Sequence, residues 1–255
     1  MFCFFSCKTQ APPPLLQTIS EEQILAEFMN TSPHGGKLVF LGIAGIRSQR
    51  QESIDLALAE AARRLAIFTE VTGEFSINST LGGRLFDYRA ETTAVLHYDP
   101  AYMDNIEALE FDEDSGVLVS GNAVFVRVLY PGSLALDYQP SALPDGARPL
   151  WIENPPERIG EYIVSIGYAG RRQAHRDTVI ASYENAIFSM IRRLFTVARG
   201  ESVDFQGDGF FDIVSTVRQS IEAKGSLTSF YVLGTWTDPI DRSVWTLAIA
   251  QAAFQ

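Results

Sequence analysis

Hydrophobic and polar positions follow one pattern in two separate stretches of the chain. The first stretch reads LVFLGIAGIRSQRQESIDLALAEAARRLA, and the second reads IVSIGYAGRRQAHRDTVIASYENAIFSMI. The two align without a gap, so that Gly42 matches Gly167 and Arg47 matches Arg172. Each copy is an apolar run, a Gly-x-Ala-Gly-x-Arg segment and a long amphipathic stretch. An internal repeat of this kind predicts two versions of one unit made of a strand, a turn and a helix.

The amphipathic part of each copy carries an apolar stripe at helical spacing. Strands are predicted just before these helices, over 38–41 and 162–166, where apolar residues predominate. Glycines between strand and helix are expected to let the backbone turn sharply. They are Gly42 and Gly45 in the first copy, and Gly167 and Gly170 in the second. The two stripes predict that both helices pack on a sheet in the same way. The first stripe consists of Ile54, Leu58, Ala61, Leu65 and Phe68, and the second of Val179, Tyr183, Ala186 and Met190.

Shorter patterns predict the remaining elements. Ser20 with Gln23 three residues later forms a capping box, which predicts a short helix that ends near Met29. Apolar residues spaced four apart predict another amphipathic helix over 211–223. Strands are expected over 92–98, 117–119, 123–129, 228–237 and 243–250, and a short helix over 100–109.

These elements predict an α+β fold of two tandem repeats, each a long helix packed on a small antiparallel sheet. A chain of 255 residues is long enough for two domains of this kind. Prolines are dense between 131 and 156, so the connection is expected there, with Trp151 packed on the second module. The predicted division is a leader, tether and short helix over 1–35, a first module over 36–138, a proline-rich linker over 139–158 and a second module over 159–255.

The chain is acidic, with a formal net charge of −11. Proteins that hold nucleic acid neutralise its phosphates with a basic surface, so nucleic acid is excluded as a partner. With 46% hydrophobic and 20% charged residues, the composition is that of an ordinary globular protein, and a hydrophobic core is expected. No run of about 18 apolar residues occurs, so no membrane-spanning helix is expected.

The N-terminus begins with the apolar MFCFFSCK and continues with the polar, proline-rich TQAPPP. An apolar run that ends in a small residue and a cysteine, here Ser6 and Cys7, is the pattern at which bacterial lipoproteins are cleaved and lipidated. Only six residues precede Cys7, and none of them is Lys or Arg, unlike an ordinary signal peptide. Two interpretations stay open. Either a signal peptide extends upstream and Cys7 is the lipid-attachment residue, or the N-terminus is apolar and carries no lipid.

The duplicated Gly-x-Ala-Gly-x-Arg segment also has a chemical interpretation. A glycine-rich turn between a strand and a helix N-terminus can bind phosphate. The three-glycine dinucleotide pattern and the Gly-Lys-Ser/Thr of the P-loop are both absent from the two copies. We therefore interpret the four glycines as a tight structural connection. Arg47 and Arg172 are expected to face solvent, with contact to an anionic ligand as the alternative.

Candidate metal ligands are sparse. His34, His97 and His175 lie in unrelated contexts, whereas metal sites usually need clustered ligands. A set of acids near 208 slightly resembles a calcium loop but lacks the EF-hand order and its final Glu, so a solvated turn is the preferred interpretation. These acids are Asp204, Asp208 and Asp212. No metal site is expected.

Catalytic signatures are also missing. No Gly-x-Ser-x-Gly elbow occurs, and the only cysteines, Cys3 and Cys7, precede the predicted modules. This distribution also rules out a disulfide framework for the body. We expect no catalytic residue and no cofactor, and hence a protein that is not an enzyme.

The second half of the chain resembles a known family. Leu150-Trp151-Ile152 with a Pro-Pro pair, then YIVSIGYAG, then a helix with small residues is similar to the bacterial outer-membrane lipoprotein family Lpp-twenty, whose module also appears in flagellar assembly protein T. The closing FYVLGTWTDPIDRSVWTLAIA is similar to the end of that module. In the first half the resemblance covers only 38–65.

This resemblance implies an α+β module, a lipid anchor at the N-terminus and a role at the cell envelope without known catalysis. We therefore expect a non-enzymatic, lipid-anchored envelope protein, on the periplasmic side of the outer membrane, that acts as a structural or protein-interaction module. Its partners would be the membrane, through the lipid, and an unknown envelope protein or further copies of itself. The alternative is a soluble periplasmic protein that binds a small ligand, or an enzyme, with a site between the two modules.

Overall fold

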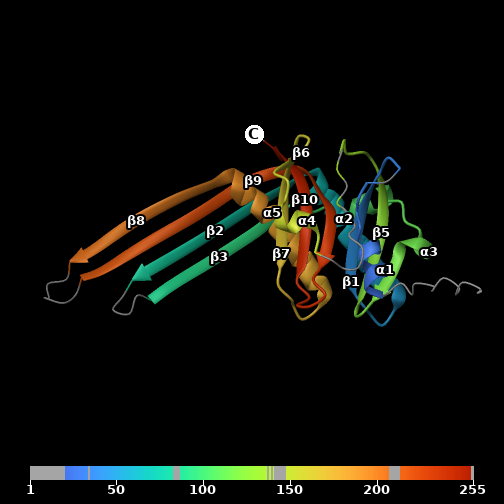
Figure 1. The fold of residues 1–255 in the computed structure, drawn as a ribbon, viewed down its shortest axis with the longest axis horizontal. Coiled ribbons are helices and arrows are strands. Elements are labelled where there is room, and N and C mark those ends of the chain that lie inside the picture. The colour runs from blue at the N-terminus through green and yellow to red at the C-terminus, as the bar shows by residue number, and fades with distance from the viewer. Residues whose placement is uncertain are drawn as a thin grey trace, which may run out of the picture.

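The computed structural model describes residues 21–33, 35–82, 87–136, 138, 140, 148–206 and 213–253. Within these residues the strands form two antiparallel sheets, and two long helices pack on them, α2 (Arg50–Thr69) and α5 (His175–Phe195). Figure 1 shows a body that holds both helices and a long arm of strands that projects from it.

The smaller sheet comes from the first half of the chain. Its order is β1-β5-β4, with β1 (Lys37–Gly45), β5 (Ala123–Pro131) and β4 (Val117–Ser120). Residues 38–44 of β1 are all buried, and α2 packs on β1 and β5. The short helices around this sheet are α1 (Glu21–Phe28), η1 (Tyr102–Ala108) and α3 (Glu113–Gly116).

The larger sheet takes strands from both halves. Its order is β3-β2-β9-β10-β7-β6, and β8 pairs with β9 as well. The helix α5 packs against β7, β9 and β10. The strands are β2 (Val71–Gly82) and β3 (Asp87–His97) from the first half, and β6 (Arg158–Ile159), β7 (Tyr162–Ala169), β8 (Thr196–Gln206), β9 (Ile213–Thr237) and β10 (Val244–Ala253) from the second.

The strand β9 belongs to both the body and the arm. Residues 226–237 pair with β10, whereas residues 217–223 lie between β8 and β2. On its other side β2 pairs with β3. We define the arm as β8, residues 213–223 of β9, β2 and β3. Figure 1 shows these strands side by side, directed away from the body.

The predicted fold of two tandem repeats, each a long helix on its own small antiparallel sheet, is wrong. The structure is mixed, with more strand than helix, and β2 of the first half pairs with β9 of the second, from Val71 opposite Leu227 to Leu81 opposite Val217. The physical reason is that each long helix is followed by a pair of strands. One strand of each pair, β2 and β9, would leave an edge unpaired, and these two strands pair with each other. The predicted module boundaries, with the first module ending at 138 and the second beginning at 159, stay a prediction.

The predicted helix over 211–223 is also wrong, because Ile213–Thr237 is a strand. A spacing of four residues recurs on one side of a helix and also on one face of a strand, so this pattern does not separate the two. The segment is rich in β-branched residues, which favour strands. Pairing with β8 on one side and β2 on the other then determines its conformation.

The hydrophobic core joins the two halves. Phe40 of β1 packs edge-on against Phe68 of α2 and Tyr231 of β9, with ring centroids 5.8 and 5.7 Å away. The Tyr231 hydroxyl accepts a hydrogen bond from the N–H of Val39 at 2.8 Å and lies within hydrogen-bonding distance of the Thr31 carbonyl. Burial raises the pKa of Tyr231, so this hydroxyl stays protonated at neutral pH.

The helix α4 (Leu150–Glu153) lies within the predicted linker. Trp151 in this helix is only 5% exposed, as expected for a large aromatic side chain. It belongs to a core cluster with members from both halves, including Phe40 and Leu247. The helix α4 contacts β10 of the second half, and the cluster around Trp151 continues into the first half.

Candidate functional site

Gly42 and Gly167 allow the two long helices to approach their strands closely. A Cβ at residue 42 would be 1.8 Å from the carbonyl oxygen of Ala57 in α2, and one at residue 167 would be 1.8 Å from that of Ser182 in α5. Both glycines lie inside strands, and neither has a positive φ. The close approach of the helix, and not a sharp turn, is therefore what requires glycine here.

The two turns between strand and helix make the same hydrogen bond. The N–H of Arg47 donates to Ser53 Oγ at 2.8 Å, and the N–H of Arg172 donates to Thr178 Oγ1 at 3.0 Å. Neither helix has a side-chain hydrogen bond at its N-cap residue. The hydroxyl groups inside the first helical turn therefore tie each turn to its helix.

The surroundings of the two turns differ. A Cβ at Gly45 would be 2.1 Å from Nη1 of Arg176, so this glycine makes room for a side chain of α5. At Gly170 the nearest atom to such a Cβ is the Tyr168 hydroxyl oxygen at 3.7 Å. Both predicted anion contacts, Arg47 and Arg172, are exposed at the surface, and Arg172 lines the larger of two cavities next to α5.

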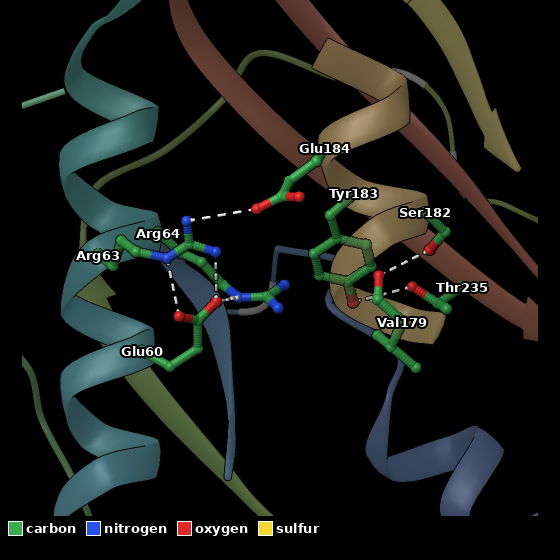
Figure 2. A network of polar contacts seen from close by, with 8 residues as sticks. All are labelled: Glu60, Arg63, Arg64, Val179, Ser182, Tyr183, Glu184 and Thr235. Atoms are coloured by element: carbon green, nitrogen blue, oxygen red, sulfur yellow. Dashed lines mark hydrogen bonds and ion pairs between the residues drawn. The ribbon is translucent and has the colours of Figure 1, made fainter. Parts of the chain in front are cut away.

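A charged network links α2 to α5, as Figure 2 shows. The carboxylate of Glu60 accepts hydrogen bonds from Nε and Nη2 of Arg63 at 2.8 and 2.9 Å, and it lies 3.3 Å from Nε of Arg64. Nη1 of Arg63 lies 3.7 Å from the Glu184 carboxylate of α5. Burial lowers the pKa of Arg63, but the hydrogen bonds and charge of Glu60 outweigh burial and raise it. The two cations and two carboxylates balance in charge.

Arg64 is the most enclosed member of this network. Its side chain is 10% exposed, and its guanidinium carbon lies 3.9 Å from the centroid of the Tyr183 ring. A desolvated cation–π contact contributes about 2 kcal/mol. Burial lowers the pKa of Arg64, and the atoms Nε and Nη2 are buried without a hydrogen-bond partner. The Tyr183 hydroxyl is hydrogen-bonded to Thr235 Oγ1 at 2.9 Å, which fixes the ring.

A small cavity of about 40 Å³ lies beside Arg64, between α2, α5 and the Tyr231 side chain. A water molecule needs about 10–15 Å³ of such volume, so the cavity admits a few waters and no metabolite. The network therefore serves best as a structural joint between the two helices.

A larger cavity of about 520 Å³, which we call the α5 groove, runs along one side of α5. Ligand sites commonly enclose about 300–1,000 Å³. The arm lies on one side of the groove, and β7 with the turn after it lies on the other. The lining residues are Ala181, Glu184, Asn185, Phe188, Ser189 and Arg192 from α5, Phe75, Thr92 and Ala94 from the arm, and Ile166, Tyr168 and Arg172 from β7 and its turn.

Contacts at the sides of the α5 groove hold its shape. The rings of Phe75 and Phe188 lie with centroids 6.3 Å apart, and the guanidinium of Arg192 lies 5.0 Å from the Phe75 ring centroid. On the other side, Nδ2 of Asn185 donates to the Tyr168 carbonyl at 2.7 Å. The first pair of contacts fixes α5 to the arm, and the last one fixes it to β7.

Two of the three histidines considered as metal ligands, His97 and His175, lie within the described residues. His175 begins α5, and burial followed by the charge of Arg242 lowers its pKa. His97 ends β3 and is exposed. Among the described residues, no group of three His, Cys, Asp or Glu side chains could hold a metal ion. Cys3, Cys7, His34, Asp208 and Asp212 lie outside the described residues.

Most residues of the α5 groove were not predicted. The repeat singled out Arg172, but nothing in the sequence connected it with Arg192 or Phe75. The α5 residues of the groove, from Ala181 to Arg192, recur at helical spacing on one side of the helix, and this spacing is visible in the sequence. The arm residues could not be found in this way, because their position depends on the pairing of β2 with β9.

No family model, curated protein or solved structure matches this chain. The resemblance to Lpp-twenty therefore stays a prediction. In the described part of the chain, no helix combines the length and apolarity needed to span a bilayer.

Proposed function

We propose that this protein is a non-enzymatic, lipid-anchored protein of the bacterial cell envelope that assembles with further copies of itself through the arm. The proposed assembly rests on the pairing of the two outer strands of the arm, β3 and β8. Among the described strands, β3 pairs only with β2, and β8 pairs only with β9. Each outer strand therefore presents a row of backbone N–H and C=O groups to which another strand can pair.

The strand directions favour a head-to-tail contact. Neighbouring strands of the arm are all antiparallel, so β3 and β8 run in opposite directions. When β8 of a second copy lies beside β3, the antiparallel order continues and both arms point the same way. Two β3 edges paired antiparallel would instead point the arms in opposite directions. A head-to-tail contact is heterologous, so it repeats from copy to copy and closes into a ring when the rotation allows.

The lipid anchor at Cys7 and the envelope location rest on the N-terminal pattern and on the resemblance to Lpp-twenty. Anchoring suits the assembly, because copies held at one membrane surface would present their arms in a common direction. Mass spectrometry of a membrane fraction from cells that express the native gene is expected to find Cys7 lipidated. An unmodified Cys7 contradicts the anchor and leaves the assembly to be tested by itself.

Sedimentation velocity over a range of protein concentrations tests the assembly. We expect species larger than the 28.2 kDa chain to grow with concentration. A monomer at every concentration contradicts the proposal. For the other candidate, a soluble periplasmic ligand-binding protein or enzyme with a site between the two halves, the cavity between α2 and α5 is too small at about 40 Å³. Such a protein would use the α5 groove of about 520 Å³, which residues of both halves line.

A further inference from the structure

Two arginines without carboxylate partners line the α5 groove. Arg172 precedes α5 in the chain and Arg192 lies near its end. Within the described residues, neither guanidinium group has an ion pair, and the only carboxylate that lines the groove, Glu184, is paired with Arg63 at 3.7 Å. The groove is therefore positively charged in a chain whose net charge is −11. This local excess favours an anionic occupant.

The length of the groove determines how many anionic groups the occupant needs. The helix side of the groove extends from Ala181 to Arg192, about three turns or about 16 Å. Arg172 lies toward the Ala181 end, because it precedes the helix. Because the two arginines lie toward opposite ends of this length, an occupant with two anionic groups suits the groove better than one small anion. An extended peptide rises about 3.3 Å per residue, so a segment of about five residues with an acid at each end spans the groove.

The middle of the groove combines apolar and polar groups. The rings of Phe75 and Phe188 provide apolar surface, with centroids 6.3 Å apart. The hydroxyls of Thr92 and Ser189 line the same groove and have no hydrogen-bond partner among the described residues. A peptide supplies apolar side chains for the rings and backbone amides for the hydroxyls, whereas a plain hydrocarbon chain leaves the hydroxyls unpaired.

We propose that the α5 groove binds an extended peptide segment of a partner protein, with an acidic residue at each end and apolar side chains between them. Arg172 and Arg192 each bind one carboxylate, and the Phe75 and Phe188 rings contact the central side chains. The groove shares Thr92 and Ala94 with β3, but its occupant contacts side chains, whereas the proposed self-assembly pairs with the outer backbone edge of β3. The groove therefore adds a second kind of partner to the proposed self-assembly.

The test titrates the full-length protein with the peptide acetyl-Glu-Leu-Ser-Leu-Glu-amide, followed by backbone amide NMR. We expect shifts at the amides of Phe188 and Ser189, and none with the Gln-ended analogue at the same concentration. Because charge-assisted hydrogen bonds are strong, Arg172→Gln and Arg192→Gln are each expected to weaken binding by about tenfold or more. The matched controls are Arg171→Gln and Arg193→Gln, exposed neighbours that do not line the groove, and they are expected to bind like the wild type.

The proposal is overturned if the Glu-ended peptide causes no shifts at the groove, if the Gln-ended peptide binds equally well, or if the four variants bind alike. Sedimentation velocity of the same variants separates this proposal from self-assembly. If Arg172→Gln and Arg192→Gln reduce association between copies and leave peptide binding unchanged, the groove is a contact between copies. In that case the peptide site is wrong and the assembly stands.

Discussion

Gly167 of β7 lies so close to Ser182 of α5 that a Cβ at residue 167 would be 1.8 Å from the Ser182 carbonyl oxygen. The same distance, 1.8 Å, separates a Cβ at Gly42 from the carbonyl oxygen of Ala57 in the first copy. These two contacts explain why both copies of the sequence repeat have glycine at this position. Each long helix rests with its backbone on a glycine of its strand, and any larger residue has to push the helix away.

The first prediction concerns this contact. Gly167→Ala is expected to lower the free energy of unfolding by about 3 kcal/mol or more, because backbone atoms cannot move aside as a flexible side chain can. Gly170→Ala is the matched control, since the nearest atom to its Cβ is the Tyr168 hydroxyl oxygen at 3.7 Å. Its expected change is within about 1 kcal/mol. Urea unfolding measures both, and equal stabilities would refute the packing role of Gly167.

The second prediction concerns the network between α2 and α5. Glu60→Gln leaves Arg63 and Arg64 close together without their shared carboxylate, and we expect a loss of about 3 kcal/mol in the free energy of unfolding. Arg64→Met is expected to cost less, because it also removes the buried Nε and Nη2 atoms that have no hydrogen-bond partner. Glu52→Gln, an exposed change on the same helix, serves as control. A larger loss for Arg64→Met than for Glu60→Gln would contradict this description.

The third prediction concerns pH. Burial, and then the charge of Arg242, lower the pKa of His175 in the folded protein. In the unfolded chain the pKa of a histidine is about 6.5. The unfolded chain therefore binds the proton more readily. The stability contributed by neutral His175 is fully present above the unfolded pKa and is lost as the pH falls toward the folded pKa.

Urea unfolding at pH 7.5 and at pH 5.5 measures this effect. The wild type is expected to lose more stability between the two pH values than the His175→Gln variant does. The same loss in both proteins would show that another group controls the pH dependence.

The parts of the fold that depend on local pattern are predictable from the sequence. The strand, glycine and helix of each copy occur where the repeat placed them, and the predicted stripe residues Ile54, Ala61 and Leu65, like Val179 and Met190, are buried. These features follow from periodicity and from the small size of glycine, which are both visible in one sequence.

The arm could not be predicted from the sequence, for physical reasons. Residues 211–223 fit both a helix and a strand by spacing alone, and only pairing with β2 and β8 settles the choice. No sequence pattern indicated that β2 would pair with β9 instead of with its own sheet. The α5 groove depends on the same pairing, so Arg172 was found without Phe75 or Arg192.

The central claim is that copies assemble through the outer strands of the arm, and the register of the arm offers a direct measurement. Ala94 of β3, Phe75 of β2, Ala223 of β9 and Thr196 of β8 lie opposite one another in one row. Ala94 and Thr196 are exposed and occupy the two outer strands. Since Cys3 and Cys7 are the only cysteines, replacing them with serine gives a background for single engineered thiols.

Two variants in this background, Ala94→Cys and Thr196→Cys, are mixed and treated with a short bismaleimide crosslinker. Head-to-tail pairing places β3 of one copy beside β8 of the next, so the account predicts dimers that join residue 94 to residue 196 in the mixture. Each variant alone is expected to give far fewer dimers. Assembly through the arm is contradicted if the mixture gives no 94-to-196 dimers, or if each variant alone is crosslinked as efficiently as the mixture.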